Sequence, residues 1–125
     1  MMSSPTKEVV MLVANVTQPP NLQMQSQVRN IFTARNVTYE EIDGSSDDKH
    51  ELRDKLFGIS GLKGDYPQIF FRTPDGGYTF VGNGASVCSL DEASKMVKDM
   101  PAILEQNPAL KSQLFEEVFA DVLPK

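Results

Sequence analysis

The sequence predicts one α/β domain in which a mixed sheet of four strands is flanked by helices and followed by a helical C-terminal extension. Apolar runs of strand type alternate with segments of helical periodicity in the first sixty residues, and two later extended runs are joined by a loop rich in glycine and proline. The expected order is β-α-β-α-β-β-α. A chain of 125 residues suits a single domain, with a core over residues 8–100 and the extension over 101–123.

The first strand and helix are predicted from residues 8–35. Residues 8–14 read EVVMLVA, which is typical of a strand buried on both faces of a sheet. After a loop, Asn21 is expected to cap a helix that ends near Arg35. The apolar stripe of that helix consists of Met24, Val28, Ile31 and Phe32.

The next strand and helix follow the same alternation. Residues 37–42 (VTYEEI) alternate apolar and polar side chains, as in a strand with one solvated face, and a turn follows at residues 43–44. Ser45 or Ser46 is expected to start the second helix, with acidic residues in its first turn. Its core face carries Leu52 and Leu56.

A hairpin is predicted after Pro67. The runs PQIFFR and YTFVG are separated only by TPDGG at residues 73–77, so these two strands must be antiparallel. The first two strands are separated by a helix, which predicts a parallel pair joined by a right-handed crossover.

Two further helices are expected after the hairpin. Ser89 opens an S-x-x-E capping box, and the helix behind it should stop before Pro101. Asn107 and the proline after it predict a second start, with apolar residues at helical spacing as far as Val122. We expect this C-terminal helix to pack on its own sheet, and the alternative is a face offered to a partner.

Composition excludes several classes of function. The net charge is -5 with a pI near 4.8, and the basic residues are scattered, which disfavours binding to nucleic acid and to anionic membranes. The longest apolar run, residues 9–14, is too short to span a bilayer, and residues 1–6 lack a signal-peptide pattern. A single cysteine excludes an internal disulfide and favours the cytoplasm, which is a reducing compartment.

Three segments resemble parts of a known fold family. They are residues 31–43 (IFTARNVTYEEID), 65–70 (DYPQIF) and 81–83 (VGN). Together with the element order, they resemble the thioredoxin fold in its short glutaredoxin form over about residues 8–100. They are still more similar to the SH3-binding glutamic-acid-rich-like proteins, a cysteine-poor branch of that fold.

The resemblance implies a cis peptide bond between Tyr66 and Pro67, the alternative being a trans proline at the start of a strand. It also implies a groove for a ligand or partner between the loop at residues 15–21, this proline and the segment 82–89. In glutaredoxins the start of the following helix binds glutathione, so glutathione is a possible ligand here. The candidate groove residues are Thr17, Gln18, Tyr66, Pro67, Gly82, Ser89 and Asp91.

The cysteine motif that gives glutaredoxins their redox activity is missing from its usual loop. Residues 15–21 read NVTQPPN, so the loop that would carry C-x-x-C or C-x-x-S holds no thiol, and thiol-disulfide exchange there is excluded. Thr17 has no neighbouring base, and we predict no catalytic residue. Cys88, just before the expected Ser89 cap, is either a thiol near a helix N-terminus, where its pKa would be lowered, or a partly buried loop residue without a role.

Other family and ligand features are not expected. None of the eight prolines stands three residues from another, so the PxxP basis of SH3 binding is absent. No metal site is predicted, because His50 and the acidic residues around it read as the polar face of one helix.

The leading hypothesis is therefore a redox-inactive, glutaredoxin-like binding or adaptor module for a protein or peptide. The alternative is a glutathione-dependent oxidoreductase or transferase in which glutathione supplies the thiol and Cys88 or Thr17 assists. A third hypothesis is a domain that only dimerises within a larger assembly. The sequence predicts no particular oligomeric state.

Overall fold

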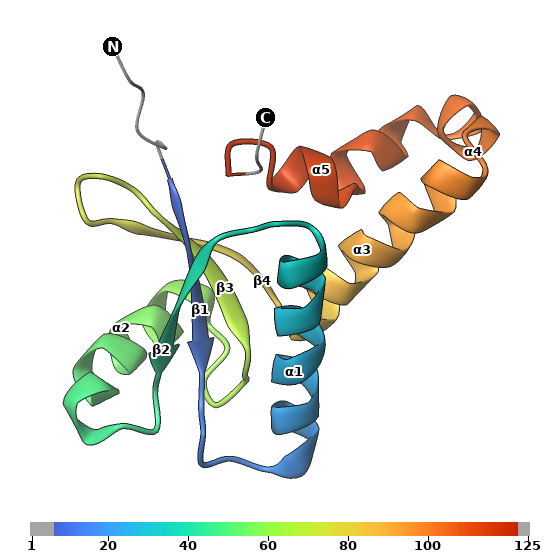
Figure 1. Ribbon diagram of the computed structural model, residues 1–125. Helices are drawn as coiled ribbons and strands as arrows, with labels where there is room; N and C mark the ends of the chain where they lie inside the picture. Colours follow the sequence, from blue (N-terminus) through green and yellow to red (C-terminus); the bar gives the residue numbers. More distant parts are fainter. Residues whose placement is uncertain (1–6, 123–125) are drawn as a thin grey trace.

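Four strands form one sheet in the order β2-β1-β3-β4 in the computed structural model, which describes residues 7–122 (Figure 1). β1 (Glu8–Val13) pairs in parallel with β2 (Tyr39–Asp43) and antiparallel with β3 (Gln68–Arg72). β3 also pairs antiparallel with β4 (Tyr78–Asn83). The predicted strand directions are confirmed. The expectations for residues 1–6 and for the last residue of the extension, residue 123, lie outside the described part of the chain.

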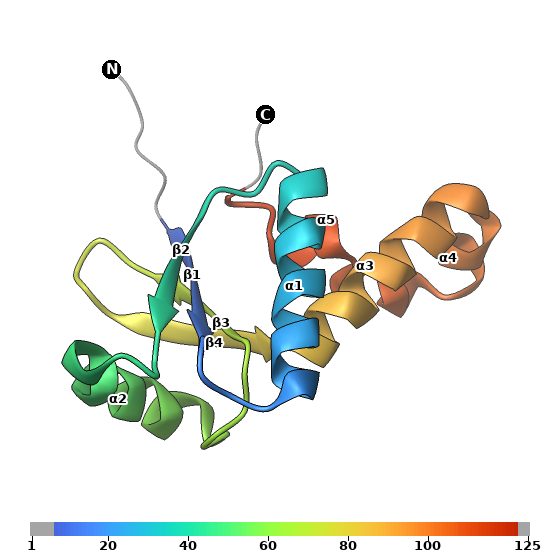
Figure 2. The ribbon, with the colours of Figure 1, turned by 60° about the horizontal axis from the view of Figure 1, so that its bottom comes forward.

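Helices cover both faces of this sheet (Figure 2). On one face lie α1 (Pro19–Ala34) and α3 (Gly84–Asp99), and on the other lies α2 (His50–Ser60), preceded by the turn η1 (Asp47–Lys49). The chain ends in α4 (Ala102–Gln106), η2 (Pro108–Gln113) and α5 (Phe115–Val118). The α/β class with a flanked, four-stranded mixed sheet is confirmed, and the arrangement is thioredoxin-like.

β1 forms the centre of the core, as its apolar sequence predicts. Val9, Met11 and Val13 face α1 and α3, whereas Val10 and Leu12 face α2. All five side chains are at most 2% exposed, which is the burial expected of a strand covered on both faces. No helix within residues 7–122 has the length and apolar content that crossing a membrane would require.

The prediction of one continuous C-terminal helix is wrong. Leu114 adopts extended backbone, with φ -89° and ψ 146°, and this breaks the segment into η2 and α5. The break lets Phe115 and Phe119 insert fully buried into the core beside Phe32. Phe119 also packs edge-on against Phe71 of β3, with ring centroids 5.7 Å apart, which confirms the expected packing of the extension on its own sheet.

The expected start of the first helix is also wrong, and that of the second is confirmed in part. α1 begins at Pro19 with Gln18 as its cap, two residues before Asn21, because proline at the first position has a suitable φ and needs no N–H partner. Before α2, Ser46 stands at the N-cap position of η1, with the expected acidic residues in its first turn, but it makes no side-chain cap hydrogen bond. The α-helix itself starts at His50.

Candidate functional site

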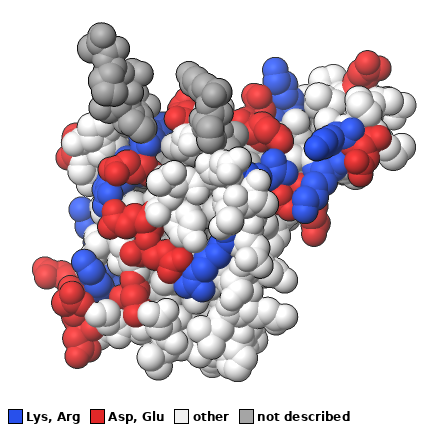
Figure 3. Space-filling model, viewed as in Figure 1, with Lys and Arg blue, Asp and Glu red and all other residues white. Residues whose placement is uncertain are grey.

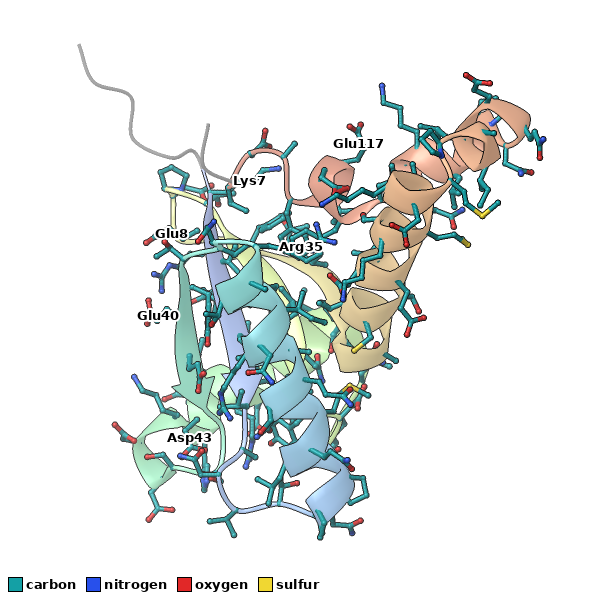
Figure 4. The ribbon with its side chains drawn as sticks, turned by 45° about the vertical axis from the view of Figure 1, so that its right-hand side comes forward. Lys7, Glu8, Arg35, Glu40, Asp43 and Glu117 are labelled. Atoms are coloured by element: carbon teal, nitrogen blue, oxygen red, sulfur yellow. The ribbon has the colours of Figure 1, made fainter. Side chains whose placement is uncertain are left out.

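The loop between β1 and α1 is anchored by the carboxylate of Asp43, which lies at the end of β2 (Figure 4). Its oxygens accept hydrogen bonds from the backbone N–H of Asn15 at 3.1 Å and from the Asn15 side chain at 2.9 Å. Ser45 donates to the same carboxylate and accepts from the N–H of Val16 at 3.3 Å. Burial alone would raise the pKa of Asp43, but these hydrogen bonds outweigh it and lower that pKa.

A second anchor lies inside the domain. Gln25, in the second turn of α1, is 1% exposed and exchanges two hydrogen bonds with the backbone of Ala14. Its Oε1 accepts from the Ala14 N–H at 2.8 Å, and its Nε2 donates to the Ala14 carbonyl at 3.2 Å. Both anchors thus hold residues 14–16, at the β1 end of the loop. The sequence analysis did not predict this role, although a glutamine beside an apolar helix stripe is the signal that could have suggested it.

Thr17 and Gln18 lie at the tip of this anchored loop. The Thr17 hydroxyl accepts a hydrogen bond from the side chain of Asn21 at 2.9 Å, one helical turn later. Gln18 is exposed and precedes the first residue of α1. Neither residue supplies a nucleophile with a base beside it, so the tip offers polar contacts and no covalent chemistry.

The start of α3 meets α1 and the strand β3 at Gly84. The Tyr66–Pro67 peptide bond is cis, and the Pro67 carbonyl accepts a hydrogen bond from the Gly84 N–H at 3.0 Å. A Cβ on Gly84 would lie 2.3 Å from Cγ of Met24 and 2.9 Å from Cδ of Pro67. Only a glycine allows this close approach, which brings the β1–α1 side of the predicted groove against its proline side.

Tyr66 does not face the groove. Its ring packs edge-on against Phe57 of α2, with ring centroids 5.8 Å apart, and it belongs to the cluster on the other face of the sheet. Burial raises the pKa of its hydroxyl. Of the predicted pair, therefore, Pro67 contacts the start of α3 at Gly84, and Tyr66 contacts α2.

The capping box predicted at Ser89 is not formed. α3 begins at Gly84, and its cap is Asn83, whose Oδ1 accepts from the Ser86 N–H at 3.0 Å. Ser89 is consequently an exposed residue of the second helical turn. Gly82 is buried beside Ser86, and a Cβ there would lie 2.8 Å from Cβ of that serine.

Cys88 lies within α3 and not at its N-terminus. Its Sγ is 3.7 Å from Sδ of Met24 and 3.7 Å from Oε1 of Gln27, both on α1. Burial, with the nearby charges of Glu92 and Asp91, raises the pKa of this thiol, so the interpretation as a thiol of lowered pKa is wrong. A protonated thiol is a weak nucleophile.

Asp91 lies apart from the other groove candidates. It is 6% exposed and accepts hydrogen bonds from Arg35 at 2.7 Å and Lys95 at 3.0 Å. Burial alone would raise its pKa, but these two cations outweigh burial and lower it. Arg35, at the end of α1 near α5 in Figure 4, also binds Glu116 at 3.1 Å.

The groove candidates around α1 and α3 share a property that the sequence analysis missed. No Asp, Glu, Lys or Arg stands from Val9 to Val28 or from Gly76 to Leu90, in a chain in which 23% of residues are charged. We call the surface of residues 15–28, 67 and 82–90 the uncharged face. It lies over the first turns of α1 in Figure 3, where the surface is white. Val16 is 83% exposed there, and Leu22 is 40% exposed.

No protein-family model matches this chain, and no curated protein matches it. Within residues 7–122, no three His, Cys, Asp or Glu side chains converge in a way that could hold a metal ion.

Proposed function

We propose that this chain is a glutaredoxin-like binding module without redox activity, which holds a protein or peptide on the uncharged face. The observation that carries the proposal is an anchored loop with no thiol. Gln25 and Asp43 hold the start of the β1–α1 loop at Ala14 and Asn15, and residues 15–18 contain no thiol and no charged side chain. A rigid loop of this kind suits recognition, because little conformational entropy is lost on binding.

The character of the uncharged face supports a protein or peptide as its ligand. It combines exposed apolar side chains, Val16 and Leu22, with amides and hydroxyls such as Gln18 and Gln27. Burying these groups avoids the large desolvation cost of burying ionised side chains. The cores of protein interfaces are similarly depleted of charge.

The likeness of residues 65–70 to the SH3-binding glutamic-acid-rich-like proteins supports membership of that cysteine-poor branch, which we propose for this chain. We also propose a cytoplasmic location, because a single cysteine fits a reducing compartment.

Site-specific photo-crosslinking in cells tests the proposal. A photo-reactive residue at Gln27, exposed on α1, should give a discrete adduct, whereas one at Glu51, exposed on α2, should not. Leu22→Glu places a charge on the uncharged face and should abolish the adduct. Ile59→Glu is the matched control, because Ile59 on α2 is 41% exposed and Leu22 is 40% exposed. An adduct that survives Leu22→Glu, or that Ile59→Glu also removes, contradicts the proposal.

The enzyme alternative is tested with glutathione. Under the binding proposal, the wild-type chain should not reduce a disulfide substrate in the presence of glutathione, and Cys88→Ser should behave identically. Activity in the wild type that disappears in Cys88→Ser would favour the glutathione-dependent oxidoreductase or transferase.

A further inference from the structure

A hollow of about 750 Å³ lies where α3 separates from the C-terminal half of α1, beside the segment that enters α5. Figure 1 shows α3 running outward from the body and the chain returning toward α5. The residues that line the hollow come from α1, from α3 and from the segment that enters α5. Its volume falls within the range of protein ligand sites. The apolar residues that line it are Ile31, Ala34, Val97 and Leu114.

The charge of the hollow differs from that of the whole chain. Its lining includes three basic side chains and two acidic ones, in a protein with a net charge of -5. The two acidic residues are already neutralised: Asp91 is buried against Arg35 and Lys95, and Glu116 binds Arg35. Lys98 forms no ion pair within residues 7–122, and the Lys95 side chain is 71% exposed. Arg35 and Lys95 are paired with these carboxylates, so the unpaired positive charge of the lining lies on Lys98.

The length of the hollow suits a short helix. Its lining extends from Asp91 to Lys98 on α3, which corresponds to about 10 Å of helix at 1.5 Å per residue. Two turns of a partner helix have this length. A helix packed in such a groove presents apolar residues to the floor and flanking side chains to the rim. Carboxylates on that partner would face Lys95 and Lys98.

We propose that this hollow docks an acidic amphipathic helix of a partner protein. Apolar side chains of the partner contact Ile31, Ala34 and Val97, and its carboxylates pair with Lys98 and Lys95. The site lies at the opposite ends of α1 and α3 from the uncharged face, and it does not depend on the function proposed for that face.

Amide NMR titration of the full chain tests the proposal with two synthetic helices. One is a Leu/Glu amphipathic peptide of about three turns, and the other is a Leu/Lys peptide with the same apolar pattern. The Leu/Glu peptide should shift the amides of residues 30–35 and 91–98, and its affinity should fall as salt is raised. The Leu/Lys peptide should bind more weakly. Equal binding of both peptides, shifts confined to other residues, or no shift at millimolar peptide would overturn the proposal.

Variants separate charge from packing in this site. Lys98→Glu should lower the affinity for the Leu/Glu peptide by about fivefold, which is the effect of one exposed ion pair. Ala34→Gln adds no charge and should weaken binding of the Leu/Glu peptide through the apolar lining, since Ala34 is exposed and its replacement leaves the core intact. Lys49→Glu, beside α2, is the matched charge control and should change nothing. An equal loss of affinity in Lys49→Glu and Lys98→Glu would show that the effect reflects only the net charge of the chain, and it would overturn the proposed site.

Discussion

The Nε of Arg35 donates a hydrogen bond to Oδ1 of Asp91 at 2.7 Å and so joins the end of α1 to the middle of α3. The two side chains are 19% and 9% exposed, and the guanidinium also lies over the Phe115 ring, 4.6 Å from its centroid. The pair therefore connects both helices to the buried start of α5. The ion pair of Arg35 with Glu116 and the hydrogen bonds of Ser94 to Phe115 and Glu116 hold the C-terminal segment against these two helices.

Removing the cation of this pair should destabilise the fold. Arg35→Met leaves the Asp91 carboxylate largely buried with only Lys95 beside it, and we expect the free energy of unfolding to fall by about 2–4 kcal/mol. Urea unfolding measures this change. Arg29→Met removes an exposed bidentate pair with Glu41 and should cost only about 1 kcal/mol or less. Similar losses in the two variants would contradict the role given to Arg35.

The same pair makes stability depend on pH. The pKa of Asp91 is lower in the folded chain, so its stabilising contribution is fully present above about pH 5 and is lost as pH falls through the folded pKa. The pKa of Glu116 is also lowered in the folded chain, because hydrogen bonds from Ser94 and Arg35 outweigh the effect of its burial. Urea unfolding at a series of pH values should show the deficit of Asp91→Asn relative to wild type shrinking below about pH 5. A constant deficit would show that Asp91 does not titrate this way.

The C-terminal segment should be required for folding. Phe119 is fully buried and stacks on Phe115 with ring centroids 4.4 Å apart, so Phe119→Ala should cost about 3–5 kcal/mol. Glu117→Ala, in the same short helix but exposed and directed outward in Figure 4, should change stability by about 0.5 kcal/mol or less. Truncation after Met100 should abolish cooperative thermal unfolding. A stable truncated monomer would instead indicate that the segment serves a partner.

Two glycines should respond to alanine in opposite directions. Gly84→Ala introduces a Cβ into contact with Met24 and Pro67 and should lower the free energy of unfolding by about 1–3 kcal/mol. Gly58 lies inside α2, and a Cβ added there would have nothing within 4 Å. Gly58→Ala should therefore raise the free energy of unfolding by about 0.5–1 kcal/mol. Thermal and urea unfolding measure both. A neutral Gly84→Ala would mean that α1 and α3 do not pack so closely.

Cys88 should be slow to react in the folded chain. Burial raises the pKa of its thiol, so the pH dependence of alkylation by iodoacetamide should give an apparent pKa above about 8.5, the value for free cysteine. The urea-unfolded chain is the control and should react faster at neutral pH. Rapid alkylation of the folded chain near pH 7 would contradict this assignment and strengthen the enzyme alternative.

Much of the fold could be predicted because its signals are local. The apolar run of β1, the helical stripe of Val28 and Phe32, and the turn residues at 73–77 each specify an element through neighbouring residues alone. The start of α3 was misplaced because Ser89 and Asn83 both carry side chains that cap helices. Which of them does so depends on the end of β4, which leads directly into the helix.

For the candidate site, the sequence by itself determined the absence of a thiol at residues 15–21 and the presence of one cysteine, since these facts depend only on which residue stands at each position. Only the tertiary structure decided that Cys88 faces Met24, that Tyr66 turns toward α2, and that Asp91 pairs with Arg35. These contacts join residues far apart in the chain. Their energies come from burial and from charges brought together by folding, and no local pattern in the sequence encodes that geometry.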